Sequence, residues 1–291
     1  MSQWTLGIIG GSGLYELDGL TNLRREHIET PWGEASSELT FGELNGVPLV
    51  FLPRHGQGHR LPPGDIPYRA NITALKQAGC SDILSISACG SLREELPPGH
   101  FVIVDQYVDH TQGRERSFFA PGCVAHVPMA DPVCSRLSRL VAEAGTAAGI
   151  ALTPRGTYLA MEGPQFSTRA ESELYRQWGL DVIGMTNMPE ARLAREAELP
   201  YASIAMVTDY DCWREHTDSV DVAQVIAVMR ANTVKAKQLL ERLTSAMSGK
   251  VRTPSPDGIE TVLDTAIITP AAARDPEMVR RLTGIAGRVL G

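Results

Sequence analysis

Short apolar runs and segments of helical period alternate along most of the chain. The segments that are predicted to be strands lie at residues 6–9, 37–44, 47–52, 83–87, 101–105, 156–161, 182–185 and 201–207. The segments that are predicted to be helices lie at residues 68–78, 132–148, 168–178, 189–196, 222–243 and 276–289. Such an alternation of strands with helices predicts an α/β fold built around one large core.

The stretch from Tyr201 to Trp213 combines a buried strand with acidic residues. Its first seven residues are mostly small or apolar on both faces, as expected for a strand inside an α/β sheet. Thr208, Asp209 and Asp211 follow where the strand ends, and ligands of open α/β sheets bind at the carboxyl ends of strands. The alternative is that the two aspartates only cap a helix or face solvent in a loop.

Three other predicted strand ends carry glycines or oxyanion donors. They are Gly10-Gly11-Ser12-Gly13, Arg54-His55-Gly56 and Ala88-Cys89-Gly90-Ser91. Glycines let the backbone approach an anion, while an Arg fork and a His offer hydrogen-bond donors. Glu16 stands where a dinucleotide fold requires glycine, and no Gly-Lys-Ser or Gly-Lys-Thr ending follows. We therefore expect a phosphate or sulfate pocket, with a surface ion pair as the alternative for Arg54 and His55.

Two irregular segments also invite a functional interpretation. Residues 106–129 have no clear period, and a loop this long inside a compact domain is usually functional or part of an interface. Phe166 lies in a loop with Gly163 and Pro164, where an aromatic ring either stacks on a flat ligand or packs against the protein. The Asn45-Gly46 pair predicts a tight hairpin between the strands on either side.

Composition narrows the classes of function. The 291 residues include 27 basic and 34 acidic side chains, and a net charge of −7 argues against a nucleic-acid surface. No apolar run approaches the roughly 20 residues that span a bilayer. The first residues lead into a strand without a leader pattern, so we expect a cytoplasmic protein without membrane partners.

Neither the cysteines nor the histidines suggest a metal site. The five cysteines include no Cys-x-x-Cys pair, and Gly56 and Gly58 make a helix between His55 and His59 improbable. A linker-like stretch begins near residue 247, after the helix at 222–243. We therefore expect a catalytic domain at residues 1–246, followed by a linker and a helical extension at 247–291.

Several motifs together resemble one known family. They are Gly10-Gly11-Ser12-Gly13, Arg54-His55-Gly56, the run from Ala88 to Glu95, the run from Glu162 to Ser167, and the run from Ala205 to Trp213. Collinear from about Gly7 to Leu243, these motifs resemble the methylthioadenosine phosphorylases of the trimeric purine nucleoside phosphorylase family. The resemblance implies a single-domain, three-layer phosphorylase/hydrolase-like fold, with a central mixed twisted β-sheet flanked by helices. It also implies a pentosyltransferase of methionine and purine salvage, with no cofactor and with inorganic phosphate as co-substrate.

The resemblance also implies roles for individual residues. The phosphate-binding positions would be Ser12, Arg54, His55, Ser87, the amide of Ala88, and Thr186. Met185 and Phe166 would contact ribose and purine, Ser167 and Thr208 would adjoin the base, and Asp209 and Asp211 would hold adenine at N7 and its 6-amino group. The 5′-methylthio pocket would consist of His59, Pro63, Val222, Val225 and Ile226, with His126 donated by a neighbouring subunit of a homotrimer.

The chemistry of the reaction fits these assignments. Cleavage of an N-glycosidic bond makes the sugar cationic and the base anionic, so a phosphate anion and a proton donor at N7 both stabilise the transition state. Relatives that use 6-oxopurines typically carry Glu in place of Ser167 and Asn in place of Asp209. We therefore predict phosphorolysis of S-methyl-5′-thioadenosine to adenine and 5-methylthioribose 1-phosphate. The alternatives are phosphorolysis of 6-oxopurine nucleosides or methylthioinosine, hydrolysis by water, and non-catalytic nucleoside binding.

Overall fold

The strand β11 (Tyr201–Asp209) lies at the centre of the molecule. In this computed structural model, which describes residues 3–11, 14, 17–214 and 222–291, β11 pairs in parallel with β5 (Asp82–Ser91) and antiparallel with β6 (Phe101–Val104). The first eight residues of β11 are buried, because apolar side chains on both of its faces contact other elements. The predicted central strand is therefore confirmed.

The described residues contain one eleven-stranded mixed sheet. Strand β1 (Leu6–Gly10) is parallel to both of its neighbours, whereas β10 (Val182–Gly184) is antiparallel to β5. The order along the sheet is β2 (Thr21–Glu26), β3 (Leu39–Leu44), β4 (Val47–Pro53), β1, β5, β10, β9 (Thr157–Met161) and β7 (Gln106–His110), with β11, β6 and β8 (Leu152–Thr153) branching from β5.

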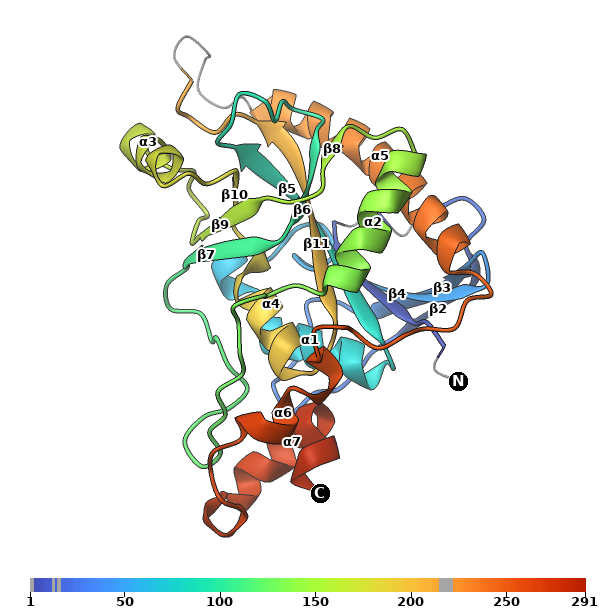
Figure 1. Ribbon diagram of the computed structural model, residues 1–291, viewed down its shortest axis with the longest axis vertical. Helices are drawn as coiled ribbons and strands as arrows, with labels where there is room; N and C mark the ends of the chain where they lie inside the picture. Colours follow the sequence, from blue (N-terminus) through green and yellow to red (C-terminus); the bar gives the residue numbers. More distant parts are fainter. Residues whose placement is uncertain (1–2, 12–13, 15–16, 215–221) are drawn as a thin grey trace.

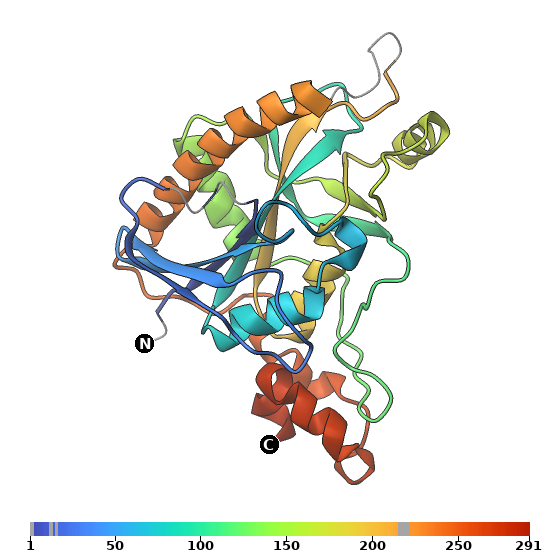
Figure 2. The ribbon, with the colours of Figure 1, turned by 180° about the vertical axis from the view of Figure 1, so that it is seen from behind.

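Helices cover both faces of this sheet. The described helices are α1 (Tyr68–Gln77), α2 (Ser135–Ala147), α3 (Arg169–Gln177), α4 (Asn187–Glu196), α5 (Val222–Met247), α6 (Leu263–Ala266) and α7 (Pro276–Leu290), with short 3₁₀ turns at Pro63–Asp65, Ile259–Thr261 and Ala271–Ala273. Helices α2 and α5 lie together on one side of the sheet, and α1 and α4 lie on the other (Figures 1 and 2).

Alternation along β11 explains this layering. Tyr201, Ala205 and Val207 pack in the cluster with α1 and α4, whereas Ile204 and Met206 pack in the cluster with α2 and α5. One strand thus contributes to two cores, and the molecule has three layers. The predicted single-domain α/β fold, with a mixed sheet flanked by helices, is confirmed.

Local sequence signals place one turn and one helix start as expected. Asn45 and Gly46 both have positive φ, at 52° and 76°, as a two-residue hairpin between β3 and β4 requires. Thr168 accepts a hydrogen bond from the amide of Glu171 and forms a capping box at the start of α3.

Other boundaries differ from the sequence prediction. Residues Ala88 to Ser91, expected to be a loop, continue β5, and the segment expected to be irregular from residue 106 begins with β7. Strand β2 was not predicted because its six residues are all exposed and carry no apolar alternation. Pairing with neighbouring strands, rather than the local pattern, forms these elements.

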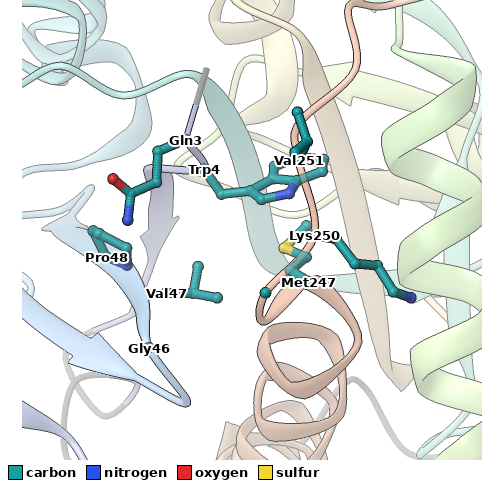
Figure 3. Close-up of a pocket in the computed structure, with 9 residues that line it drawn as sticks. Gln3, Trp4, Gly46, Val47, Pro48, Met247, Lys250 and Val251 are labelled. Carbon is teal, nitrogen blue, oxygen red and sulfur yellow. The ribbon is translucent and has the colours of Figure 1, made fainter. Parts of the chain in front are cut away.

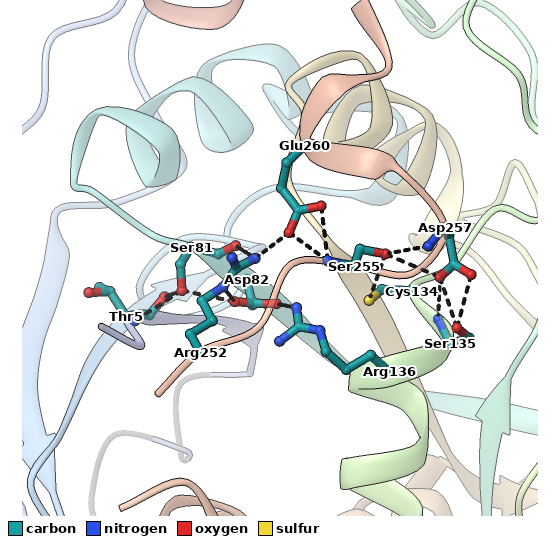
Figure 4. A network of polar contacts seen from close by, with 10 residues as sticks. All are labelled: Thr5, Ser81, Asp82, Cys134, Ser135, Arg136, Arg252, Ser255, Asp257 and Glu260. Carbon is teal, nitrogen blue, oxygen red and sulfur yellow. Dashed lines mark hydrogen bonds and ion pairs between the residues drawn. The ribbon is translucent and has the colours of Figure 1, made fainter. Parts of the chain in front are cut away.

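The C-terminal residues pack against the rest of the chain. Leu263, Leu282 and Ile285 are at most 1% exposed and belong to the same cluster as α1 and α4. Figure 4 shows a second attachment, in which Arg252 and Arg136 both pair with the fully buried Asp82 at the start of β5. Residues 247–291 are therefore joined to the sheet by both apolar and charged contacts.

None of the helices in the described ranges combines the length and the apolar character needed to span a membrane.

We predict that Leu282→Ala destabilises the whole protein, because Leu282 is fully buried against α1. Leu→Ala at a buried site costs about 2–5 kcal/mol in the free energy of unfolding. Urea denaturation measures the change, and Ile268→Ala, at a side chain of the same extension that is 59% exposed, is the control. Equal stability of Leu282→Ala and the parent protein would show that the extension does not contribute to the core.

Candidate active site

A shift of register places the acidic pair at the end of β11. Val207 pairs with Cys89, but Asp209 pairs with Gly90, so Thr208 is the extra residue of a bulge. The Thr208 hydroxyl lies 3.1 Å from the carbonyl of Cys89 and 2.7 Å from Asp209 Oδ2. The bulge thus places Asp209 beside the end of β5.

The two aspartates lie in a largely desolvated place. Asp209 Oδ1 accepts a hydrogen bond of 2.8 Å from the Asp211 amide, and Asp211 is held at a φ of 52°. Burial raises the pKa of both carboxyl groups above the usual range for Asp, and the charge of Asp209 raises that of Asp211 further. Burial therefore makes protonation of these carboxylates easier than in water, and a protonated carboxyl group is able to donate a hydrogen bond.

Gly90 lets the acidic pair approach the sheet. A Cβ at this position would lie 3.0 Å from Asp209 Oδ1, 3.1 Å from Ile183 Cγ2 and 3.3 Å from Asp211 Cβ. Any side chain would push against the carboxyl groups or against β10. A small residue at a strand end was recognised in the sequence, but its close contact with Asp209 depends on the pairing of β5 with β11.

Arg54 is held by Glu190, which was not among the residues predicted from the sequence. Its side chain is 2% exposed, and its Nε and Nη2 donate to Glu190 at 2.8 Å and 3.0 Å. Burial alone would lower the pKa of Arg54, but the Glu190 carboxylate raises it above its ordinary value. Glu190 also accepts a hydrogen bond of 2.8 Å from the hydroxyl of Tyr201, so Arg54 is a fixed cation between the sheet and α4.

His55 differs from the expectation of a second donor. Its Nδ1 lies 2.8 Å from the carbonyl of Leu61, which requires a proton on that nitrogen. Burial lowers the pKa of His55 to about 4, so the ring is neutral at pH 7 and its Nε2 is an acceptor. A bound oxyanion would therefore need a protonated oxygen to donate a hydrogen bond to Nε2 of His55.

The other expected phosphate ligands lie close to Arg54. The main-chain amide of Arg54 donates to the carbonyl of Gly10. The guanidinium Nη2 of Arg54 donates to Ser85 Oγ at 2.6 Å. Two residues further along β5, the Ser87 hydroxyl lies 3.3 Å from Asn187 Oδ1, next to Thr186 at the start of α4. The structure thus brings Arg54, Ser87, the partly exposed Ala88 and Thr186 to one region.

The loop between β9 and α3 lies next to the corner after β10. Phe166 is 55% exposed, whereas Ser167 is buried and its carbonyl accepts a hydrogen bond from Cys212 Sγ at 3.2 Å. A Cβ on Gly163 would lie only 2.4 Å from Met185 Sδ. Phe166 thus presents its ring to solvent on a loop that is packed against Met185.

The expected 5′ pocket is only partly described. His59 stacks on His55 with ring centroids 3.9 Å apart, and Pro63 is buried. Val225 is partly buried and Ile226 is 43% exposed, so among the described side chains of α5 the buried apolar ones begin at Ala236. Ser12 and the Val222 side chain lie outside the described part of the chain.

His126 lies away from the other candidate residues of its own chain. Its amide donates to the carbonyl of Ala266 at 2.9 Å, and the neighbouring Ala125 forms a β-bridge with Ile267. Figure 1 shows this segment beside α6 and α7, at the end of the molecule opposite the tip of β11. Within one chain, His126 therefore does not meet Asp209.

One hollow of the described structure does not coincide with the candidate site. It has a volume of about 280 Å³ and lies between the β3–β4 turn and the end of α5. Figure 3 shows Trp4, Val47, Met247 and Lys250 around it, and none of the expected ligands lines it. In the part of the chain that the structure describes, no three His, Cys, Asp or Glu side chains gather as a metal site would require.

Known proteins resemble the chain over its whole length. Residues 5–245 match the sequence profile of the Phosphorylase superfamily. The S-methyl-5′-thioadenosine phosphorylase of Bradyrhizobium diazoefficiens is 57% identical over 290 residues, covering 100% of this chain and 99% of that protein. The enzyme of the same name from Cereibacter sphaeroides is 55% identical over 285 residues, covering 98% of each.

Solved structures agree with this match. A methylthioadenosine phosphorylase from an antarctic soil metagenomic library has a TM-score of 0.90 at 46% identity, covering 98% of this chain and 99% of that one. A variant of the Schistosoma mansoni adenosine/methylthioadenosine phosphorylase in complex with methylthioadenosine has a TM-score of 0.83 at 35% identity, covering 94% and 99%. The chain belongs to the Phosphorylase superfamily and, within it, to the S-methyl-5′-thioadenosine phosphorylase family, as its motifs indicated.

Proposed function

We propose that the protein cleaves S-methyl-5′-thioadenosine with inorganic phosphate, releasing adenine and 5-methylthioribose 1-phosphate. The observation that carries the proposal is the desolvated Asp209–Asp211 pair at the end of β11, in a chain that also holds Arg54, Ser87 and Thr186 in one region. Full-length relatives that bear the name of this activity support the same reaction.

The acidic pair suits adenine better than a 6-oxopurine. N7 of adenine accepts a hydrogen bond and its 6-amino group donates one, so a protonated acid and a carboxylate acceptor complement that edge. The pKa of Asp209 is raised by burial, which favours the protonated form that N7 needs. Ser167, where 6-oxopurine relatives carry Glu, provides no carboxylate for the N1 proton of hypoxanthine. Asp209 is thus the proposed proton donor, and Asp211 helps to fix the amino edge.

The nucleophile is inorganic phosphate, held without any further cofactor. The fixed cation of Arg54 and the hydroxyls of Ser12, Ser87 and Thr186 donate to its oxygens, and neutral His55 accepts from a protonated one. As the glycosidic bond breaks, this anion stabilises the cationic sugar while Asp209 neutralises the departing base. Phe166 stacks on the purine, Met185 contacts the ribose, and Thr208 supports Asp209.

The proposed assembly is a homotrimer. His126 lies on a segment remote from the site of its own chain, as is expected of a residue that completes a neighbour's 5′-methylthio pocket. There it would join His59, Pro63, Val222, Val225 and Ile226. We also propose a cytoplasmic location, because all five cysteines are unpaired and four of them are buried, which fits a reducing compartment.

We expect Arg54→Ala to raise the phosphate KM steeply, because the variant loses the positive charge that Glu190 holds at a fixed position in the site. Arg54→Lys, which keeps the charge but loses the bidentate bond to Glu190 that fixes it, should fall between this variant and the parent protein. Steady-state rates of adenine release over a range of phosphate concentrations measure the effect. Release of adenine at a comparable rate without phosphate would contradict the assignment of phosphate as the nucleophile.

The proposed homotrimer can be tested separately. Sedimentation at assay concentration should show a trimer, and His126→Ala should raise the KM for methylthioadenosine more than the KM for adenosine, since it removes a side chain from the 5′ pocket. A monomer with full activity would contradict the proposed interface.

Base choice is tested at Asp209 and Ser167. Asp209→Asn keeps the shape but removes the acid, so kcat on methylthioadenosine should fall by a factor on the order of 10²–10⁴. Adding Ser167→Glu supplies an acceptor for the purine N1 proton, so the double variant should gain on 5′-methylthioinosine relative to methylthioadenosine. The ratio of kcat/KM for the two nucleosides is measured for the parent protein, both single variants and the double variant. An unchanged ratio in all four proteins would show that Asp209 and Ser167 do not determine which purine base is accepted.

A further inference from the structure

Arg114 is a buried arginine that none of the proposed steps uses. It lies in the irregular segment that follows β7, and its side chain is 1% exposed. Its Nε donates to both carboxylate oxygens of Glu162, at 3.2 Å and 3.0 Å, and its Nη2 donates to the Glu162 carbonyl at 2.6 Å. One side of the guanidinium therefore holds the residue that opens the Phe166 loop.

The remaining nitrogen of Arg114 holds a second segment. Nη1 donates to the carbonyl of Met185 at 2.6 Å and to that of Met188 at 2.8 Å. These carbonyls flank Thr186 and Asn187, so the chain between β10 and α4 turns around the guanidinium. Arg114 thus fixes the corner at Met185 and Thr186, which are the proposed ribose and phosphate contacts.

A third contact leads toward the proposed 5′ pocket. Nη1 also donates to the hydroxyl of Tyr68 at 3.0 Å, and this hydroxyl donates in turn to the carbonyl of Pro63 at 3.0 Å. Tyr68 lies at the start of α1 and is 5% exposed. The same cation therefore reaches three segments that are far apart in the sequence.

We propose that Arg114 is a positioning residue, which sets the spacing between the Phe166 loop and the Met185–Thr186 corner around the nucleoside. The inference rests on the proposed function, since Phe166 and Met185 are its nucleoside contacts. A planar fork with five donors suits a carboxylate on one edge and main-chain carbonyls on the other, whereas the ammonium of Lys cannot span both. Arg114 acts through these partners and not on the substrate.

A purely structural role makes a different kinetic prediction. A buried ion pair that only stabilises the fold leaves kcat and KM unchanged in the fraction of protein that remains folded. A positioning role changes the reaction of the folded protein, because small displacements of ligand-bearing groups reduce the rate strongly. The nucleoside should be affected more than phosphate, because Arg114 bonds both segments that carry the proposed nucleoside contacts, at Glu162 and at Met185, whereas Thr186 is the one proposed phosphate ligand among the described residues on a segment that it holds.

The test compares Arg114→Met with Arg136→Met in the full-length protein, well below both melting temperatures. Arg136 is the matched control, because it is a buried arginine that pairs with a carboxylate, Asp82 (Figure 4). Asp82 is at the start of β5, whereas the candidate site is at the end of that strand. Arg114→Met should lower kcat/KM for methylthioadenosine by on the order of 10–100-fold, with a smaller change in the phosphate KM. Arg136→Met should lower the melting temperature only. Arg114→Lys should fall between parent and Arg114→Met, and it decides the question if Arg114→Met does not fold.

Hydrogen exchange provides a readout that does not depend on activity. Amides of residues 163–168 and 185–188 should exchange faster in Arg114→Met than in the parent protein, and at the parent rate in Arg136→Met. Parent-like exchange and parent-like nucleoside kinetics in a folded Arg114 variant would overturn the positioning role. If the parent protein does not cleave methylthioadenosine, the proposed function fails, and hydrogen exchange still decides whether Arg114 fixes the two segments.

Discussion

The parallel pairing of β5 with β11 is the constraint on which the site depends. Both strands are buried, and their register shifts between Val207 and Asp209, so that Asp209 lies against Gly90. Because helices packed on both faces fix the register, the bulge holds the Asp209 carboxyl group against the end of β5. The raised pKa values of Asp209 and Asp211 therefore follow from the fold rather than from a charged neighbour alone.

The same strand β5 also organises the phosphate side. Ser85 contacts Arg54 from within the sheet, Ser87 faces the start of α4, and Gly90 adjoins the acidic pair. Successive residues of a strand rise by about 3.3 Å, so Ser87 at the proposed phosphate end and Gly90 at the proposed base end are separated by roughly 10 Å along one rigid element. In the proposed mechanism, a single strand thereby sets the distance between the two groups that act on opposite sides of the glycosidic bond.

Local pattern was enough to predict the central strand, its aspartates, the β3–β4 hairpin and most helices. It was not enough for β2 or β7, whose residues are exposed or only partly buried and which form by pairing with a neighbour. Glu190 also escaped prediction, since it is 136 residues from Arg54 and an acidic residue is ordinary in the first turn of a helix. The roles of Ser12, His126 and the 5′ pocket come from family resemblance, because no local pattern distinguishes these residues.

The central claim is phosphate-dependent cleavage of an adenine nucleoside. The most direct measurement incubates the purified protein with methylthioadenosine, adenosine or inosine, each with and without phosphate, and follows the free base and the sugar 1-phosphate. The account predicts adenine together with methylthioribose 1-phosphate from methylthioadenosine only when phosphate is present, and little base from inosine. Base release without phosphate, or preferred cleavage of inosine, would contradict it.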